Sequence, residues 1–173
     1  MMEGTYYKEW SAVLDREMEF KVYGHGGVPV LALPARGGRF YDWENNGMPD
    51  AAARLRRPRT FAGAMGLSGL YDMGRFLGSA EDDLVLRSSP LAALHKNGIC
   101  DRNVLSRAEE NSLLLCVGQG GYEGDALADT QALADTLSEV RFPCHLEVWG
   151  GDVSHDWYWW GKEFGMFAER LFG

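Results

Sequence analysis

The second half of the chain alternates short apolar segments with helical ones, and this order restricts the fold more than any other feature. The segment "NSLLLCVGQGG" is apolar without a break from Leu113 to Val117, as in a strand buried on both faces. Segment 125–140 carries apolar residues at three- and four-residue spacings and is predicted to be an amphipathic helix. "CHLEVWGG" predicts a second strand. The order strand, helix, strand predicts an α/β fold with a mostly parallel sheet flanked by helices.

The end of the sequence predicts one more helix. The segment "WWGKEFGMFAERLFG" repeats apolar residues at helical spacing. The residues that this spacing places on one face are Trp160, Phe164, Phe167 and Leu171.

The first half contains further candidates. "REMEFKVYGHGG" alternates Met18, Phe20 and Val22 with charged residues, which predicts a half-buried strand. "VPVLALPARGG" is apolar from Val28 to Leu33 and predicts a central strand of the parallel sheet. "FAGAMGLSGLYD" predicts another strand, and "MPDAAARLRR" a short helix. Because no repeat or linker interrupts residues 1–173, we predict a single domain.

Charge and cysteine content exclude several classes of partner and cofactor. The net charge of −8 disfavours a nucleic acid or an anionic membrane as partner. No apolar run is long enough to cross a membrane, and residues 1–20 lack the apolar segment of a secretory signal. The cysteines match no zinc or redox spacing, and we interpret Cys100, Cys116 and Cys144 as reduced thiols. We therefore expect a cytoplasmic protein with no metal ion and no organic cofactor.

Polar side chains follow three predicted strands at their carboxyl ends, where ligands bind in parallel α/β sheets. Ser68, Glu123 and His155 occupy these positions. In nucleophilic acyl transfer an imidazole takes the proton of a serine, and a carboxylate fixes the tautomer of the imidazole. The chain order serine, acid, histidine is that of the α/β-hydrolases. Asp125 and Asp152 lie in the same loops, so the order alone leaves the acid open between these two and Glu123.

Each of these residues also has a purely structural interpretation. Ser68 suits a turn, Glu123 suits the N-terminal end of a helix macrodipole, and Asp125 suits an N-cap. His155 is also compatible with an exposed loop. The tryptophans beside it, which are Trp157, Trp159 and Trp160, suit a core or a pocket wall.

Four segments resemble one branch of the α/β-hydrolases, which includes S-formylglutathione hydrolases, enterobactin esterases, feruloyl esterases and mycolyltransferases. The segments are "VLALPARGGRFYDWENNGM", "FAGAMGLSGLYD", "LLLCVGQGGYEGDAL" and "EVWGGDVSHDWYWW", and they run in the order of that family. The resemblance implies a shortened α/β-hydrolase-like sheet, with His155 as the base and Glu123 as the orienting acid. It also implies that the loop containing Gly37 and Gly38 supplies one N–H of the oxyanion hole.

The sequence departs from that family at the nucleophile. The family carries its serine in a Gly-x-Ser-x-Gly motif, which this chain lacks. The chain passes directly from "DAAARL" to "RRPRTFAG", so an apparent deletion junction lies near residues 55–59. We expect the strand before Ser68 to move into the vacated central place. Ser68 is then the predicted nucleophile, and Gly69 the second oxyanion donor.

The predicted function is that of a small serine carboxylic-ester hydrolase for short acyl or aryl esters. The aromatic residues expected to line an open apolar pocket are Tyr41, Trp43, Trp157 and Tyr158. An alternative is an impaired esterase or ligand-binding module that keeps the histidine and acid but lacks a nucleophile. A third interpretation is a homodimer, which would cover the sheet edges exposed by the missing strands.

Overall fold

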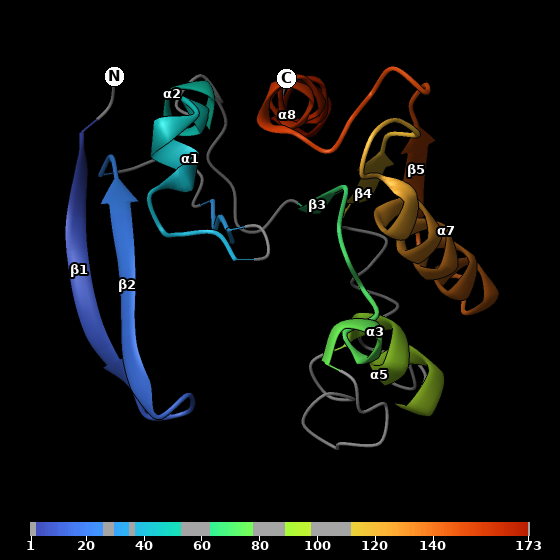
Figure 1. Ribbon diagram of the computed structural model, residues 1–173, viewed down its shortest axis with the longest axis horizontal. Coiled ribbons are helices and arrows are strands. Elements are labelled where there is room, and N and C mark those ends of the chain that lie inside the picture. The colour runs from blue at the N-terminus through green and yellow to red at the C-terminus, as the bar shows by residue number, and fades with distance from the viewer. Residues whose placement is uncertain are drawn as a thin grey trace. The chain divides into compact units, whose positions relative to one another are not determined.

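The computed structural model describes residues 3–25, 30–34, 37–52, 63–77, 89–97 and 112–172. The chain divides into two compact units. One contains Met1–Phe61 together with Ala168–Gly173, and the other contains Ala62–Phe167. Figure 1 labels the helices and strands of both. The single domain stays a prediction, and the junction expected near 55–59 lies outside the described residues.

The first unit contains an antiparallel hairpin of β1 (Gly4–Ser11) and β2 (Arg16–Tyr23). The strand predicted around Met18 to Val22 is confirmed as β2, whereas the sequence analysis did not predict β1. The rings of Tyr7 and Phe20 stack across the two strands with centroids 5.3 Å apart. This face is exposed, contrary to the expected half-burial, and Phe20 keeps 40% of its surface accessible. A two-stranded ribbon provides no second sheet to bury the face.

The opposite face of the hairpin lies against the segment that follows it. Tyr6 packs on the ring of Phe40, and Lys21 forms an ion pair with Glu44. Glu44 belongs to the short helix α1 (Asp42–Asn45), which is followed by α2 (Met48–Ala52). The α2 helix confirms the start of the helix predicted in "MPDAAARLRR".

The central strand predicted from Val28 to Leu33 is wrong over the residues that are described. Residues 30–34 form no strand, and the side chains of Val30, Leu31 and Leu33 are exposed. A strand is stabilised by hydrogen bonds to a neighbour. Within the described ranges no strand pairs with this segment, and β3 (Gly63–Leu67) pairs only with β4 (Ser112–Val117). The expected move of β3 beside the apolar run is therefore not found.

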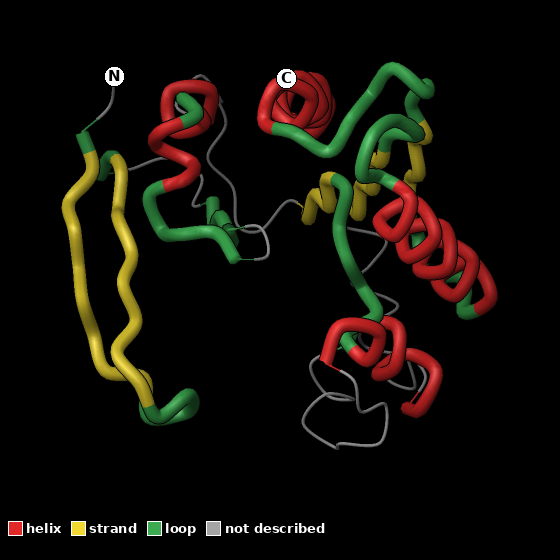
Figure 2. The backbone as a smooth tube through the Cα atoms, in the orientation of Figure 1, coloured by secondary structure: helices red, strands yellow, loops and turns green. Residues whose placement is uncertain are grey.

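The second unit is built on a parallel sheet in the order β3-β4-β5, with β5 spanning Cys144–Val148. Figure 2 shows these strands together with the helices of the unit. The predicted strands around Leu113–Val117 and from Cys144 are confirmed, as is the helix predicted over 125–140, which is α7 (Gly124–Glu139). The mixed α/β architecture with a parallel sheet is therefore as predicted.

Helices cover both faces of this sheet (Figure 1). The core on one side combines Leu115 of β4 with residues of two helices, α5 (Pro90–Asn97) and α7; these residues are Leu91, Leu133 and Leu137. Side chains alternate between the faces of a strand, so Cys116 points to the other side. There it neighbours Glu163 of α8 (Trp157–Phe172), the predicted terminal helix. Among the described helices, none is long and apolar enough to cross a membrane.

Candidate active site

Ser68 directly follows β3 and lies in the second unit, close to the carboxyl end of the sheet. Its N–H donates to the carbonyl of Cys116 at 2.8 Å, which continues the pairing of β3 with β4 by one residue. Its φ angle is +48°, a left-handed conformation that is uncommon for a residue other than glycine. The side chain is 4% exposed, and its hydroxyl donates to Glu123 Oε1 at 2.7 Å.

Glu123 occupies the turn between β4 and α7. It lies at the N-cap position of α7, yet its side chain caps no backbone N–H. The carboxylate is instead buried, with 1% of its surface exposed, and its Oε2 atom lies 3.4 Å from His155 Nδ1. Neither of these two atoms has a hydrogen-bond partner within the described ranges. Glu123 is therefore the acid beside His155, whereas the side chain of Asp125 is 66% exposed and faces Arg75.

His155 lies in the loop between β5 and α8. Its backbone N–H donates to the carbonyl of Gly121 at 3.0 Å, and its ring meets Trp160 edge-on with centroids 4.8 Å apart. The first contact fixes the backbone and the second the ring, yet the side chain keeps 27% of its surface exposed. The tryptophan ring thus restrains the imidazole on one side and leaves it accessible on another.

Glycines allow the two loops that carry Glu123 and His155 to approach closely. Gly120 donates its N–H to the carbonyl of Val153 at 2.8 Å. A Cβ at Gly118 would lie 2.2 Å from the same carbonyl oxygen, and a Cβ at Gly120 would lie 2.5 Å from it. Any side chain at these positions would separate the loops. The segment "GQGG" is therefore required for the contact between the acid and the histidine.

Asp156, next to the histidine, has a structural role. Its Oδ1 atom accepts the backbone N–H groups of Tyr158 and Trp159 at 3.0 and 3.3 Å, as an N-cap does. Its Oδ2 atom accepts the hydroxyl of Ser154 at 2.6 Å. This hydrogen bond is the main reason why the pKa of Asp156 is lowered. Asp156 thus anchors the start of α8 and, with it, the loop that contains His155.

The three predicted catalytic residues are brought together, but their order of contact differs from the predicted one. In a serine triad the imidazole lies between the serine and the carboxylate. Here the carboxylate of Glu123 lies between the hydroxyl of Ser68 and the imidazole of His155. In the described part of the chain, Ser68 donates a hydrogen bond to the acid, and no hydrogen bond joins it to the histidine.

Glu163 is a further residue of this region that the sequence analysis missed. It lies on α8 and is completely buried. Burial, followed by the nearby charge of Glu123, raises its pKa to about 7, while the Cys116 thiol and His155 act in the opposite direction. Burial also raises the pKa of the Cys116 thiol, and Glu163 adds to that rise. A sequence signal existed, because position 163 falls on the apolar helix face, between Trp160 and Phe167.

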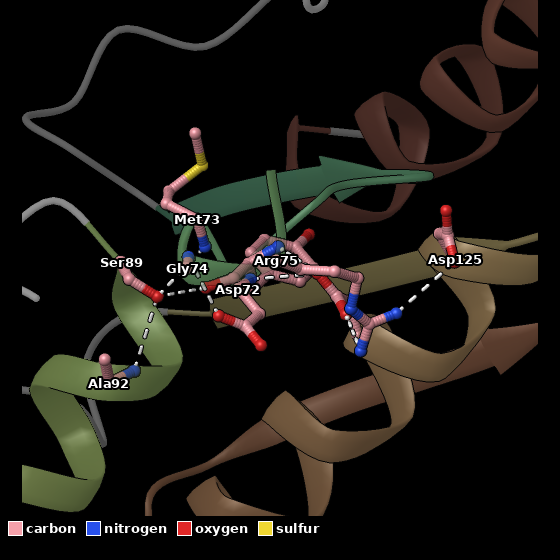
Figure 3. A network of polar contacts seen from close by, with 9 residues as sticks. Asp72, Met73, Gly74, Arg75, Ser89, Ala92 and Asp125 are labelled. Carbon is pink, nitrogen blue, oxygen red and sulfur yellow. Dashed lines mark hydrogen bonds and ion pairs between the residues drawn. The ribbon is translucent and has the colours of Figure 1, made fainter. Parts of the chain in front are cut away.

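A hydrogen-bond network holds the segment after Ser68 (Figure 3). The buried carboxylate of Asp129, on α7, accepts the backbone N–H groups of Tyr71 and Asp72 from its Oδ2 atom, both at 2.9 Å. Its Oδ1 atom lies 3.0 Å from a guanidinium nitrogen of Arg75, on the short helix α3 (Gly74–Leu77). Arg75 also reaches Asp125 at 3.4 Å. The chain beyond Ser68 is thereby tied to α7, the helix that Glu123 precedes.

Ser89 forms the second half of the same network (Figure 3). Its hydroxyl donates to the carbonyl of Tyr71 at 3.0 Å and accepts the N–H groups of Met73 and Ala92 at 3.2 and 3.5 Å. Serine followed by Pro90 is a common start of a helix, since proline has no N–H to leave unpaired there. Ser89 thus caps the start of α5, and the same hydroxyl fixes the loop after β3.

The predicted oxyanion-hole residues are found in different units. Gly69 adjoins Ser68 and packs under Tyr71, where an added Cβ would lie 2.3 Å from the ring atom Cζ. Gly37 and Gly38 belong to the first unit, and Gly37 has a φ angle of +74° in a turn. The role of all three glycines stays a prediction.

The predicted pocket residues are divided in the same way. Tyr41 and Trp43 belong to the first unit, and Tyr41 packs edge-on against Phe40 at 5.0 Å. Trp157 lies in the second unit, edge-on to Trp160 with centroids 5.1 Å apart. Tyr158 is 63% exposed and carries the ammonium of Lys162 over its ring at 4.3 Å. Of these four residues, Trp157 is the one that contacts Trp160, the ring that packs against His155.

No group of three or more histidine, cysteine or acidic side chains in the described part of the chain has an arrangement that could hold a metal ion. A surface hollow is lined by residues from the end of α7 and the start of β5: Ala134, Ser138, Arg141, Phe142, Pro143 and Cys144. It lies at the amino end of β5, whereas His155 follows the carboxyl end. The polar groups suited to chemistry are thus those around Glu123 and His155.

No protein-family model matches the sequence, and no curated protein matches it. Solved structures do share its fold. An S-formylglutathione hydrolase from Staphylococcus aureus, FrmB, is 11% identical, with a TM-score of 0.56 over 100% of both chains. FphF, a fluorophosphonate-binding serine hydrolase of the same species, is 12% identical, with a TM-score of 0.59 over 98% of this chain and 99% of that one. The chain has an α/β-hydrolase fold.

A ferulic acid esterase is also similar, at 16% identity and a TM-score of 0.47. That match covers 73% of this chain and 48% of the esterase, so the chain spans about half of the esterase's length. In the α/β-hydrolase fold, catalytic residues lie in loops at the carboxyl ends of the strands. Ser68, Glu123 and His155 occupy such loops after β3, β4 and β5.

Proposed function

We propose that the chain hydrolyses carboxylic esters with short acyl or aryl groups, with His155 as general base and Glu123 as the acid that orients it. The observation that carries the proposal is the 3.4 Å approach of Glu123 Oε2 to His155 Nδ1. A buried carboxylate at this distance orients the imidazole and selects the tautomer that has its proton on Nδ1. The other ring nitrogen is then free to accept a proton.

The proposed reaction uses these groups in sequence. His155 accepts a proton from a nucleophilic O–H group as the oxygen of that group attacks the ester carbonyl. The imidazolium, stabilised by Glu123, then returns the proton to the leaving alkoxide, and the alcohol departs. Ser68 supports the acid in this scheme, because its hydroxyl bonds the carboxylate oxygen that does not face the histidine.

Two nucleophiles fit this scheme. Water fits the order of contacts, since Ser68 already donates its hydroxyl to Glu123. Ser68 itself is favoured by a different observation: it directly follows a strand and has a φ angle of +48°, a strained turn of the kind that presents the serine in α/β-hydrolases. For this route its hydroxyl must leave Glu123 and turn to the imidazole, and Gly69 would supply an oxyanion N–H. The departing alcohol leaves the acyl group on Ser68, and a water molecule deprotonated by His155 then cleaves that ester to release the acid. A chain that binds acyl or aryl ligands without turnover is the third case.

Labelling with a fluorophosphonate, followed by mass mapping, separates these routes. The test also measures hydrolysis of p-nitrophenyl acetate by the native chain and by Ser68→Ala. The water route predicts turnover without labelling and activity that survives in Ser68→Ala. The serine route predicts a label on Ser68 and loss of turnover in the variant. Absence of turnover by the native chain rejects the proposed function.

The expected binding partners and cellular location are part of the same proposal. We expect a small-molecule ester as partner, no nucleic acid and no membrane, and a cytoplasmic location. A homodimer stays a prediction that light scattering after size exclusion tests. A mass equal to one chain would reject it.

A further inference from the structure

The strand β2 has one edge along which no strand pairs in the described part of the chain. Its other edge pairs with β1, in the register that places Tyr7 beside Phe20 (Figure 1). An unpaired strand edge presents a row of N–H and carbonyl groups to which a further strand can bind. A two-stranded hairpin is only marginally stable by itself, whereas additional strands stabilise it. This edge, which we call the open edge of β2, is therefore a candidate interaction surface.

The side chains of β2 differ in chemistry between the two faces of the hairpin. Met18, Phe20 and Val22 lie on one face, where Met18 keeps 39% and Val22 46% of its surface accessible. Glu19 and Lys21 alternate with them and lie on the other face. An acid followed by a base is complementary in charge to the same strand running in the opposite direction. The open edge of β2 is thus suited to a second copy of itself.

Charge decides which register such a pair would take. A two-fold axis perpendicular to the sheet keeps each face on its own side, so the residue at the axis lies opposite its own copy. With Glu19 or Lys21 at the axis, two like charges would face each other. With Met18 at the axis, Glu17 would face Glu19 of the second copy. With Phe20 at the axis, Glu19 faces Lys21 of the second copy twice, and no like charges meet.

The same register also matches the apolar face. With Phe20 at the axis, Met18 lies opposite Val22 of the second copy, and the two Phe20 rings are neighbours. Within each chain Phe20 already stacks on Tyr7, with ring centroids 5.3 Å apart. The aromatic rings of both hairpins would therefore form one row across the joined strands, and such cross-strand pairs stabilise a sheet.

The edge of β1 has no comparable register. Lys8 and Glu9 are the charged residues of β1, and as sequence neighbours they lie on opposite faces. Because the two-fold axis keeps the faces apart, a symmetric pairing of β1 never places Lys8 opposite Glu9. The complementary charges are thus a property of β2.

We propose that two copies of the chain associate through the open edges of β2, in antiparallel register with Phe20 at the two-fold axis. The two ion pairs between Glu19 and Lys21 flank the axis and select this register. In each chain Glu19 Oε1 accepts the hydroxyl of Tyr6 at 2.7 Å, and Oε2 is the oxygen that receives the ammonium of Lys21 from the second copy.

This association is expected to be reversible. A single strand edge buries less surface than the interface of a permanent dimer does, so the mass should rise with concentration. The inference assigns a surface and a register to the homodimer expected above, and it does not depend on ester hydrolysis.

Exchanging the two charges tests the register. Glu19→Lys and Lys21→Glu each place like charges opposite each other on both sides of the axis. Each variant should therefore raise the dissociation constant of the dimer at least about tenfold. An equimolar mixture of the two variants restores opposite charges in both pairs, so the mixed dimer should form with close to the native affinity. Sedimentation equilibrium between about 1 μM and 1 mM measures these masses.

Glu9→Lys is the matched control, because it makes the same change of charge on β1 and should leave the dimer unchanged. A native mass of one chain at every concentration would overturn the inference and leave the open edge of β2 to another part of the same chain. Native dimers that persist equally in Glu19→Lys and Lys21→Glu would also overturn it, whereas a homodimer through a different surface would stand. Failure of the mixture to associate would reject the register.

If either single variant does not fold, hydrogen exchange of the native chain decides. Dilution through the range in which the dimer dissociates should speed the exchange of backbone N–H groups in β2 and leave that of α7, in the second unit, unchanged. Exchange in β2 at the same rate at every concentration would overturn the inference.

Discussion

Ser68 donates its hydroxyl to Glu123 Oε1 across 2.7 Å, and the other oxygen of the same carboxylate lies 3.4 Å from His155 Nδ1. The carboxylate is therefore held by the serine on one side and faces the imidazole on the other. This arrangement gives Ser68 a role even if another group attacks the substrate. A carboxylate free to rotate would hold the histidine less well.

Replacing Ser68 with alanine should therefore destabilise the fold. The variant loses a hydrogen bond to a buried charged group, which is worth about 1.5–3 kcal/mol. Urea unfolding measures the change, with Ser138→Ala, at an exposed position of α7, as the control. Ser68→Gly loses the same hydrogen bond but relieves the positive φ angle, so it should be more stable than Ser68→Ala by about 1 kcal/mol. Equal stability of the native chain and Ser68→Ala would show that the hydrogen bond contributes nothing.

Asp129 should be essential for the stability of the second unit. Asp129→Ala leaves the backbone N–H groups of Tyr71 and Asp72 without their acceptor and removes the closer of the two carboxylate partners of Arg75. We expect a loss of about 2–4 kcal/mol in the free energy of unfolding. Asp125→Ala breaks only the longer, exposed contact to Arg75 and should cost less than about 1 kcal/mol. Similar losses in both variants would contradict the assignment of the network to Asp129.

The contact between Gly66 and Tyr71 allows a test by rescue. An added Cβ at Gly66 would lie 2.1 Å from the hydroxyl oxygen of Tyr71, so Gly66→Ala should cost about 1–3 kcal/mol. That hydroxyl is buried without a partner in the described structure, so Tyr71→Phe alone should be neutral or slightly stabilising. In the double variant the alanine gains room on the side of Tyr71, while Leu115 Cδ2 still lies 2.9 Å from the added Cβ, so we expect part of the loss to be recovered.

The matched control for this test is Gly161→Ala. Nothing lies within 4 Å of a Cβ at this helical position, so the variant should gain about 0.5–1 kcal/mol from its better helix former. Thermal unfolding of the four variants measures the set. If the double variant loses as much stability as Gly66→Ala, the predicted collision with Tyr71 is rejected.

Glu163 should make the stability of the protein depend on pH. Its pKa rises from 4.5 to about 7 on folding, so the folded chain binds a proton that the unfolded chain has lost between these values. Stability therefore falls as the pH rises through this window, by about 3 kcal/mol in total, and stays lower above it. Glu163→Gln lacks this titration. Unfolding at pH 5 and pH 8 should show the variant gaining on the native chain at the higher pH, and a constant difference would contradict the prediction.

The elements that the sequence predicted well are those with a strong local pattern. The unbroken run from Leu113 to Val117 and the spacing in segment 125–140 are decided by residues close in the chain. The meeting of Glu123 with His155 also followed from the sequence, because neighbouring parallel strands end at the same edge of a sheet. Here the pattern and the topology agree.

Other features depend on contacts that no local pattern records. The apolar run at 30–33 has the composition of a buried strand, but a strand also needs a hydrogen-bonded neighbour, which is not found for it in the described residues. The partner of Ser68 depends on its φ angle and rotamer, which a serine followed by a glycine in a turn does not specify. By residue type, Glu163 suggests an acid on the helix surface. Only its spacing from Trp160 and Phe167 indicates that it lies on the apolar face.

The rate of ester hydrolysis by His155→Gln, compared with His25→Gln, tests the central role of the acid–histidine pair. Both variants lose one imidazole. His25 belongs to the first unit, whereas Glu123 and His155 belong to the second. We predict that kcat/KM for p-nitrophenyl acetate falls at least about 100-fold in His155→Gln and is unchanged in His25→Gln. Equal rates for His155→Gln and the native chain would contradict the role of His155 as the base.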